Sequence, residues 1–396
     1  MKKHIWILST LLFFFSCKSE PVETTPTAIR GVWVPAPQFT EVLHSYSNVK
    51  KFVQLLENLH MNAIYLVSYA GTSTIYKSQV LTDYSTCGSQ EDCYMLQPYM
   101  ANYSSATNDP VRDLIDQAHQ AGIKVFFWFE YGFMGEGKPI PAHNPLLAKN
   151  TDWLGIGNDG KPSHYNNSDY YFNAYNPSVR NYLLKLVEEA IMLYPDIDGI
   201  QGDDRMPAMP RNSGYDKYTV ELYKEQHDGK LPPSDYNNPE WVRWRLNILN
   251  EFANTLYTRV KKINPEIMVS FAPNPYPWCE EKLMQEWPEW CKNGRCDLLA
   301  VQCYRYTAEA YRSTVKEVLS HAKKSNPQQL FAPGMILMEG GNTKMTPGLL
   351  QEQLQINRQL GITGEIFFYN KGLENPGIQQ VLRKMYTTKV SFPTIK

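Results

Sequence analysis

Eight short apolar runs alternate with longer amphipathic segments, and this alternation constrains the fold more than any other feature of the chain. Most of the runs are continuously apolar, as expected for parallel strands that are covered on both faces. Eight strands, each followed by a helix, predict an α/β fold of the (β/α)8 barrel type, a TIM barrel. The alternative is a doubly wound open sheet, which normally carries a Gly-rich turn after an early strand. No such turn is present, because Gly31 stands alone.

The expected strands are 30–35, 63–69, 124–130, 198–203, 268–272, 298–304, 331–337 and 365–369. The expected helices are 48–60, 109–121, 177–194, 239–264, 281–290, 308–325, 347–360 and 375–386. Long connections follow the second, third and fourth strands, at 70–108, 131–176 and 204–238, whereas the connections that precede strands are short. Because the loops after barrel strands form the active face, we expect long loops and a binding site at the C-terminal face of the barrel.

The N-terminus has the pattern of an export signal. Lys2 and Lys3 precede an apolar segment, 5–15, that is too short to span a bilayer and ends at Ser16-Cys17. This pattern resembles a bacterial lipoprotein signal and predicts lipidation of Cys17 after cleavage. The alternative is an ordinary signal peptide or an uncleaved anchor. We therefore expect a signal segment at 1–17, a flexible tether at 18–28 and a single barrel domain at 29–396, held by a lipid anchor at the bacterial cell envelope, on its periplasmic or outer-surface side.

Export would allow disulfides to form. Cys87 and Cys93 lie six residues apart in a polar loop, and Cys291 and Cys296 flank a four-residue turn. We predict both pairs as disulfides, with reduced cysteines as the alternative. A bond from Cys279 to Cys291 is not expected, because the predicted helix between them would separate them by roughly 18 Å.

Carboxylates stand at the predicted carboxyl ends of three strands. Glu130 ends the third strand, Asp203 and Asp204 end the fourth, and Glu339 follows the seventh. Glycoside hydrolysis needs one carboxyl as a proton donor and a second as nucleophile or base, about 5–10 Å apart. Residues on different strands at the mouth of a barrel reach such a separation. We therefore predict Asp203 and Glu130 as the catalytic pair, with Glu339 as the less favoured partner of Asp203.

The two adjacent aspartates are expected to differ in role, since neighbouring strand residues point to opposite faces. If Gln201 faces the barrel interior, Asp203 does so too, and Asp204 takes a supporting position. The aromatic residues around Glu130 are expected to raise its pKa and suit it to act as the acid, while Arg205 and Asp204 keep Asp203 charged. Which carboxyl is the acid stays open at this point. A solvated Asp-Asp-Arg turn and a surface Glu130 are the structural alternatives.

Polar and aromatic residues near the strand ends are candidates for substrate binding, in keeping with an aromatic content of 13%. Trp33 and Trp128 have the alternative of filling a barrel layer, and Gln302, Tyr304 and Arg305 that of capping the barrel. The candidates are Trp33, Trp128, Tyr131, Gln201, Arg205, Asn274, Gln302, Tyr304, Arg305, Glu339 and Tyr369.

Other functional classes lack their sequence features. The net charge of −1 offers no basic field for nucleic acid. The 8 histidines are scattered, and the first strand ends Val34-Pro35-Ala36-Pro37 rather than in the His-x-His of barrel metallohydrolases. No Gly-x-Ser-x-Gly, phosphate-binding or dinucleotide-binding motif is present. We therefore expect no metal, no cofactor and no nucleic-acid partner.

Five motifs resemble the glycosyl hydrolase-like family 10 barrels of bacterial envelope lipoproteins. They are RGVW at 30–33, WFEYGF at 128–133, DGIQGDD at 198–204, WVRWR at 241–245 and QCYRY at 302–306, and in the family's order they cover about residues 29–370. The resemblance implies a (β/α)8 barrel, a glycan substrate such as peptidoglycan strands or another polysaccharide, and a site that includes Asp203, Asp204 and Glu130. Gly202 stands where relatives often have Phe, which would widen the pocket.

The fourth strand also resembles the Asp-Gly-Phe-Arg-x-Asp run of α-amylase-type barrels, whose last Asp is the nucleophile and matches Asp203. Gln201 replaces the Arg of that run, and no carboxylate ends the fifth strand, so the amylase mechanism is not carried over whole. The sequence thus predicts an envelope-anchored glycoside hydrolase. The alternative is a glycan-binding lipoprotein on the same barrel that has lost turnover.

Overall fold

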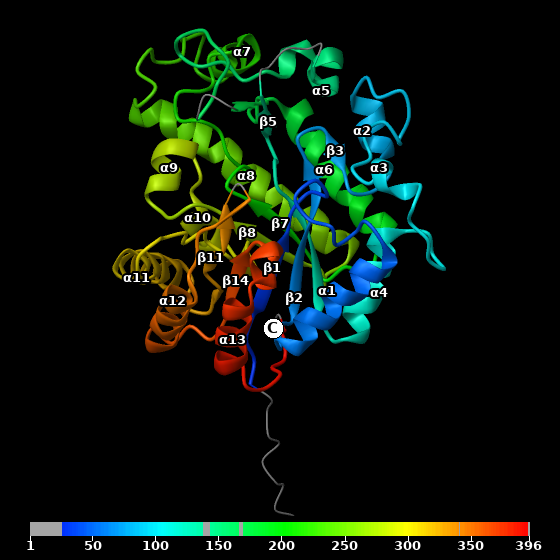
Figure 1. The fold of residues 1–396 in the computed structure, drawn as a ribbon. Coiled ribbons are helices and arrows are strands. Elements are labelled where there is room, and N and C mark those ends of the chain that lie inside the picture. The colour runs from blue at the N-terminus through cyan, green and yellow to red at the C-terminus, as the bar shows by residue number, and fades with distance from the viewer. Residues whose placement is uncertain (1–25, 138–142, 166–168, 340, 395–396) are drawn as a thin grey trace, which may run out of the picture.

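Parallel strands form a barrel in the computed structural model, which describes residues 26–137, 143–165, 169–339 and 341–394 (Figure 1). β1 pairs with β2 on one side and with β14 on the other, so the first and last strands meet. The strands follow one another around the sheet as β1 (Arg30–Val34), β2 (Ala63–Ala70), β4 (Lys124–Phe129), β7 (Gly199–Asp203), β8 (Met268–Ala272), β9 (Leu298–Leu299), β10 (Leu330–Phe331), β11 (Gly334–Ile336) and β14 (Glu365–Phe368).

β10 and β11 are two parts of one barrel strand. Ala332 and Pro333 separate them, and a proline has no backbone N–H with which to continue a ladder. β10 pairs with β9, β11 pairs with β14, and a bridge between Gln302 and Gly334 spans the interruption. The eight-stranded (β/α)8 prediction is therefore confirmed, although the sixth strand is shorter than the predicted 298–304.

Seven long helices surround the barrel in the part of the chain that the structure describes, and most begin with the same local signal. Their caps at Asp109, Asn176, Asn238, Thr346 and Asn375 accept backbone N–H groups, and each cap is followed by Pro at the first helical position. The helices are α1 (Tyr46–Asn58), α4 (Pro110–Gln120), α6 (Pro177–Leu193), α8 (Pro239–Ile263), α11 (Ala308–Ser325), α12 (Pro347–Gln359) and α13 (Pro376–Met385).

The predicted helix at 281–290 is wrong. Two short helices, α9 (Trp278–Leu283) and α10 (Trp287–Lys292), take its place. Met284 ends α9 with a φ of 55°, in the left-handed region, and Pro288 cannot donate the hydrogen bond that a continuous helix requires. The segment between them approaches the fourth strand, as described below.

Small elements inserted after the strands gather at one end of the barrel, as predicted for long loops on the C-terminal face (Figure 1). They include β3 (Ser73–Thr74), α2 (Gln79–Tyr84) and α3 (Gln97–Met100) after β2, β5 (Met134–Glu136), α5 (Pro145–Lys149), η2 (Thr151–Trp153) and β6 (Asp169–Tyr171) after β4, α7 (Lys217–Gln226) after β7, β12 (Met338–Glu339) and β13 (Asn342–Thr343) after β11, and η3 (Asn370–Glu374) after β14.

Inside the barrel, a polar chain is enclosed by aromatic rings. The indole N–H of Trp33 donates to Gln201 Oε1 at 2.7 Å, and Gln201 Nε2 donates to Ser270 Oγ at 2.8 Å. The rings of Trp33, Trp128 and Phe368 lie 6.2–6.4 Å apart. Trp33 and Trp128 are buried, so both fill the barrel interior. Gln201 therefore faces inward, which was the condition for expecting Asp203 to face inward too.

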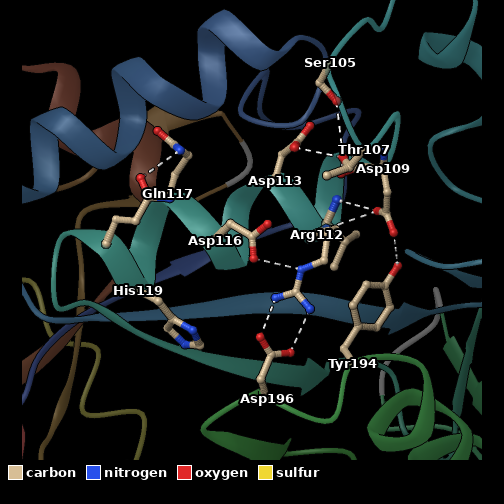
Figure 2. Close-up of polar contacts among 12 residues, drawn as sticks. Ser105, Thr107, Asp109, Arg112, Asp113, Asp116, Gln117, His119, Tyr194 and Asp196 are labelled. Atoms are coloured by element: carbon tan, nitrogen blue, oxygen red, sulfur yellow. Dashed lines mark hydrogen bonds and ion pairs between the residues drawn. The ribbon is translucent and has the colours of Figure 1, made fainter.

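Outside the barrel, charged groups join α4 to the segment between α6 and β7 (Figure 2). Arg112 binds Asp196 through two nitrogens at 2.8 and 2.6 Å, and its Nε lies 3.0 Å from Asp116. Asp109, which caps α4, also accepts the hydroxyl of Tyr194 at 3.0 Å. The hydrogen bond from Arg112 lowers the pKa of Asp196.

The cysteines only partly follow the prediction. Cys87 and Cys93 form a disulfide in the β2–α4 connection, with Cα atoms 6.3 Å apart. The predicted bond between Cys291 and Cys296 is wrong, since both are free and buried. Burial, and next a hydrogen bond with Cys291, raise the pKa of the Cys296 thiol well above its usual range.

The signal segment 1–17 with Cys17 lies outside the described residues, as does the tether up to residue 25. The end of the predicted tether belongs to the barrel instead, because Ala28 is buried and its N–H donates to the Ser391 carbonyl at 3.1 Å. Thr27 also bridges to Ser391. Within the described part of the chain, no helix combines the length and apolar character needed to cross a bilayer.

Candidate active site

Asp203, the last residue of β7, is enclosed at the end of the strand. Its side chain is 1% exposed. Oδ1 accepts the backbone N–H of Arg205 at 2.9 Å, and Oδ2 accepts the Arg205 guanidinium at 2.9 Å and the indole N–H of Trp128 at 3.2 Å. Burial raises the pKa of Asp203 well above its usual range; Arg205 opposes this, while the charges of Asp204 and Glu130 add to it. Asp203 therefore stays protonated at a pH where an ordinary aspartate is ionised.

Asp204 is the more accessible of the two aspartates, with a side chain that is 20% exposed. Its Oδ2 accepts a hydrogen bond from Asn274 Nδ2 at 3.1 Å, and its Oδ1 accepts one from Gln302 Nε2 at 3.2 Å. Arg205 Nη1 lies 3.2 Å from the same Oδ1. Because Asn274 follows β8 and Gln302 follows β9, three neighbouring strands hold this carboxylate at the mouth of the barrel.

Arg205 is the centre of an acidic cluster. Its Nη1 contacts both aspartates and donates to the backbone carbonyl of Glu130 at 3.2 Å, and its guanidinium carbon lies 5.4 Å from the centre of the Tyr131 ring. Burial acts to lower the pKa of Arg205, but the charges of Asp204, Asp203 and Glu130 outweigh it and raise the pKa well above its usual range. One guanidinium thus contacts two carboxyls and is also influenced by the charge of a third, an excess of negative charge that favours retention of a proton within the cluster.

Glu130 follows β4 directly and is half-buried. Its charge raises the pKa values of both Asp203 and Arg205, so its carboxyl belongs to the same cluster. The sequence argument expected Arg205 and Asp204 to keep Asp203 charged, and that expectation is wrong. The burial of Asp203 outweighs its ion pair with Arg205, and the nearby charge of Asp204 favours the neutral form.

The other predicted site residues differ in their distance from the acidic cluster. Trp128, Tyr131, Asn274 and Gln302 contact the carboxyls or Arg205, as described above. Tyr304 stacks on Phe368 with ring centres 5.4 Å apart, and Tyr369 is buried beside Phe368.

Arg305 and Glu339 contact other parts of the C-terminal face. Arg305 donates to the backbone carbonyl of Tyr304 at 2.7 Å, and its own carbonyl accepts from Gln353 at 2.9 Å. Glu339 accepts the hydroxyl of Tyr306 at 2.9 Å and lies 3.8 Å from Lys344. These contacts hold loops together rather than joining the two residues to the acidic cluster.

Gln285 is a site residue that sequence reasoning missed. It is buried in the break between α9 and α10, and its Nε2 donates to the backbone carbonyls of Asp203 at 2.9 Å and Pro207 at 3.2 Å. It thereby fixes the chain as it leaves β7. The sequence placed Gln285 inside a predicted helix, so no signal pointed to this contact.

Gly202 has a different role from the one expected. A Cβ atom at this position would lie 2.5 Å from the Met206 carbonyl oxygen and 3.2 Å from the Phe271 ring. Glycine therefore lets the chain after β7 fold back against the strand. The space left by the missing side chain is filled by this chain, so Gly202 does not widen a pocket as predicted. The described residues contain no cluster of three or more His, Cys, Asp or Glu side chains arranged to hold a metal ion.

The fold and this cluster define a class: a (β/α)8 barrel with grouped carboxyls at the carboxyl ends of its third and fourth strands. The model of the family glycosyl hydrolase-like 10 matches residues 28–342. The chain belongs to this family. It is 22% identical over 312 residues to the glycosyl hydrolase DigH of Escherichia coli K12, an alignment that covers 69% of this chain. The chain spans 66% of the length of that curated relative.

Solved structures share the fold. The glycoside hydrolase domain of PgaB (BpsB) from Bordetella bronchiseptica superposes with a TM-score of 0.65 at 15% identity, covering 90% of this chain and 98% of that one. The cold-adapted β-galactosidase of Rahnella sp. R3 gives a TM-score of 0.60 at 11% identity, covering 95% of this chain and 58% of that one. At these identities the likeness concerns the barrel itself.

Proposed function

We propose that the protein is a glycoside hydrolase that cleaves the glycosidic bonds of a polysaccharide, with peptidoglycan glycan strands as one candidate. The observation that carries the proposal is the group of three carboxyls around Arg205 at the mouth of the barrel. Glycosidic cleavage needs two carboxyls in different protonation states, and a cluster with excess negative charge supplies them. Membership of a glycosyl hydrolase-like family supports a carbohydrate substrate.

Exposure separates the roles of the three carboxyls. Asp204, at 20% exposed, can reach a sugar as a carboxylate and attack or stabilise the anomeric carbon. Glu130, half-buried on the neighbouring strand, is the proposed donor of a proton to the glycosidic oxygen, a role that requires it to be protonated in the complex with the substrate. Asp203, at 1% exposed and holding a proton, is a positioning residue. When Asp203 is neutral, the positive charge of Arg205 is available to pair with the negative charge of Asp204.

Release of reducing ends from a panel of polysaccharides tests the proposal. The panel includes peptidoglycan strands stripped of peptides, chitin and a galactan, and the variants are Asp204→Asn and Glu130→Gln. We expect release by the wild type from at least one polymer, with a strong loss in both variants. A wild type that binds a polymer without releasing ends would instead favour the glycan-binding lipoprotein. Full activity in both variants would place the chemistry elsewhere, with Glu339 as the next candidate.

We also propose that Cys17 carries a lipid that holds the protein at the bacterial envelope. The support is the apolar segment 5–15 followed by Ser16-Cys17. Labelled fatty acid should enter the wild type in growing cells, and Cys17→Ala should prevent this. Equal labelling of the two proteins, or none in either, would contradict the proposal.

A further inference from the structure

Two aromatic rings from different loops meet at the mouth of the barrel and remain open to solvent. Tyr165, in the β4–α6 connection, is 46% exposed. Trp278, the first residue of α9, is half-buried. Their ring centres lie 5.4 Å apart with an interplanar angle of 83°. An edge-to-face contact covers no more than one face of one of the two rings. Trp278 also packs against the hydrophobic core, so most of the exposed ring area belongs to Tyr165.

The pair lies close to the acidic cluster. Trp278 is four residues after Asn274, whose amide donates to Asp204 at 3.1 Å. Four residues span at most about 14 Å even when fully extended, so Trp278 lies within a few sugar units of the carboxyls. A sugar chain bound at the cluster would reach the rings by extending over this distance along the loop that joins Asn274 to Trp278.

Backbone hydrogen bonds hold both segments that carry the rings. The carbonyls of Lys282 and Leu283, at the end of α9, accept the N–H groups of Arg211 and Met209 at 2.9 and 3.0 Å. These bonds tie α9 to the chain that follows Asp203 and Asp204. On the other loop, the backbone N–H of Tyr165 donates to Asp169 Oδ1 at 3.0 Å. Defined backbone contacts thus hold both loops that carry the two rings.

We propose that Tyr165 and Trp278 form a platform on which a sugar ring of a long glycan stacks, next to the acidic cluster. The apolar face of a sugar ring packs on an aromatic face, while its hydroxyls remain free for water or for amides such as Asn274. The substrate class is therefore a polymer that extends past the cleavage point rather than a small glycoside. This inference rests on the proposed hydrolase function, which it narrows to long chains.

The test compares Trp278→Ala and Tyr165→Ala with the wild type on a polymer and on a short substrate. Met192→Ala is the matched control, because Met192 is also apolar and 67% exposed but lies in the last turn of α6. Retention on insoluble chitin and on peptidoglycan strands measures binding, and hydrolysis of the same polymers and of chitotriose measures turnover. We expect each platform variant to lose about tenfold in polymer affinity, about 1.4 kcal/mol, with chitotriose turnover unchanged.

The outcomes separate this inference from the proposed function. If the wild type cleaves a polymer and both platform variants bind and cleave it equally well, the platform is wrong and the hydrolase stands. If the wild type cleaves nothing, retention still decides: loss of retention in the platform variants, but not in Met192→Ala, supports the platform. A wild type retained by none of the polymers overturns it. Because Tyr165 is far more exposed than Trp278, Tyr165→Ala keeps the test decisive even if Trp278→Ala fails to fold.

Discussion

Replacing Asp203 with Asn should change how the stability of the protein depends on pH. Burial raises the pKa of Asp203 in the folded protein above that of an unfolded aspartate, about 3.9. Between these two pKa values the folded state holds a proton that the unfolded state has released. The free energy of unfolding of the wild type therefore falls as pH rises, by about 1.4 kcal/mol per pH unit for this one group. Asp203→Asn removes that contribution.

At low pH, hydrogen bonds determine the difference in free energy of unfolding between the wild type and Asp203→Asn. Asp203 accepts from Arg205 at both oxygens and from Trp128 at one. An asparagine that keeps the two bonds at Oδ2 turns its NH2 group toward the backbone N–H of Arg205, and leaving that donor unpaired costs about 1–3 kcal/mol. Asp203→Asn should thus be less stable than the wild type near pH 3 and should overtake it as pH rises.

Urea unfolding of both proteins at 25 °C across pH 3–8, followed by tryptophan fluorescence, measures this difference. A crossing of the two stability curves is the expected result, with the variant gaining about 1.4 kcal/mol per pH unit between pH 4 and the raised pKa of Asp203. The pH profile of hydrolysis gives a second readout. Asp203→Asn should shift the pH optimum of kcat while lowering kcat at that optimum only slightly. A difference in stability that stays constant from pH 3 to 8, or a wild type that gains stability over the variant as pH rises, would show that Asp203 is ionised in the folded state and would refute the reasoning.

Three further outcomes are expected. Asp204→Asn and Glu130→Gln should each lower kcat by about 10²–10⁴-fold while leaving the fold intact, as measured by reducing-end release and circular dichroism. Arg358→Met should destabilise the protein by about 3–5 kcal/mol in urea unfolding, because it leaves the fully buried Glu365 without its ion pair at 2.8 Å, and adding Glu365→Gln should restore part of the loss. Cys93→Ser should cost about 2 kcal/mol by opening a short loop, and peptide mapping without reductant that finds no Cys87–Cys93 bond would contradict this.

The barrel could be predicted because its signals are local. Continuous apolar runs, Asn-Pro or Asp-Pro helix starts and the placing of long loops each depend on a few neighbouring residues. The failures come where distant parts of the chain decide the structure. At Met284 the helix ends although the sequence pattern continues, and this lets Gln285 reach the carbonyls of Asp203 and Pro207. No periodicity in the sequence reports such a contact.

The site shows the same division. Strand ends placed Glu130, Asp203 and Asp204 together correctly, because the carboxyl ends of adjacent parallel strands meet. The protonation states were not predictable, since they depend on how completely each carboxyl is buried and on the number of charges that share Arg205. From the sequence alone, an aspartate two residues from an arginine is expected to form a stable ion pair with it and to stay charged. Here the same guanidinium also faces Asp204 and responds to the charge of Glu130, so the most buried of the three carboxyls keeps the proton.

The role of Asn274 depends on tertiary structure that the sequence alone does not show. Between two prolines it has the sequence context of a turn residue, and its value to the site depends on β8 ending beside β7 in register, with Ala272 opposite Asp203. That register sets the loop after β8 so that the amide reaches Asp204 and the Asn274 carbonyl accepts the indole N–H of Trp287 at 3.3 Å. One residue therefore links the carboxylate proposed to act on the sugar to the α9–α10 segment that carries Trp278. The chemistry and the proposed glycan platform consequently depend on the same loop, and a change in that loop should alter cleavage and polymer binding together.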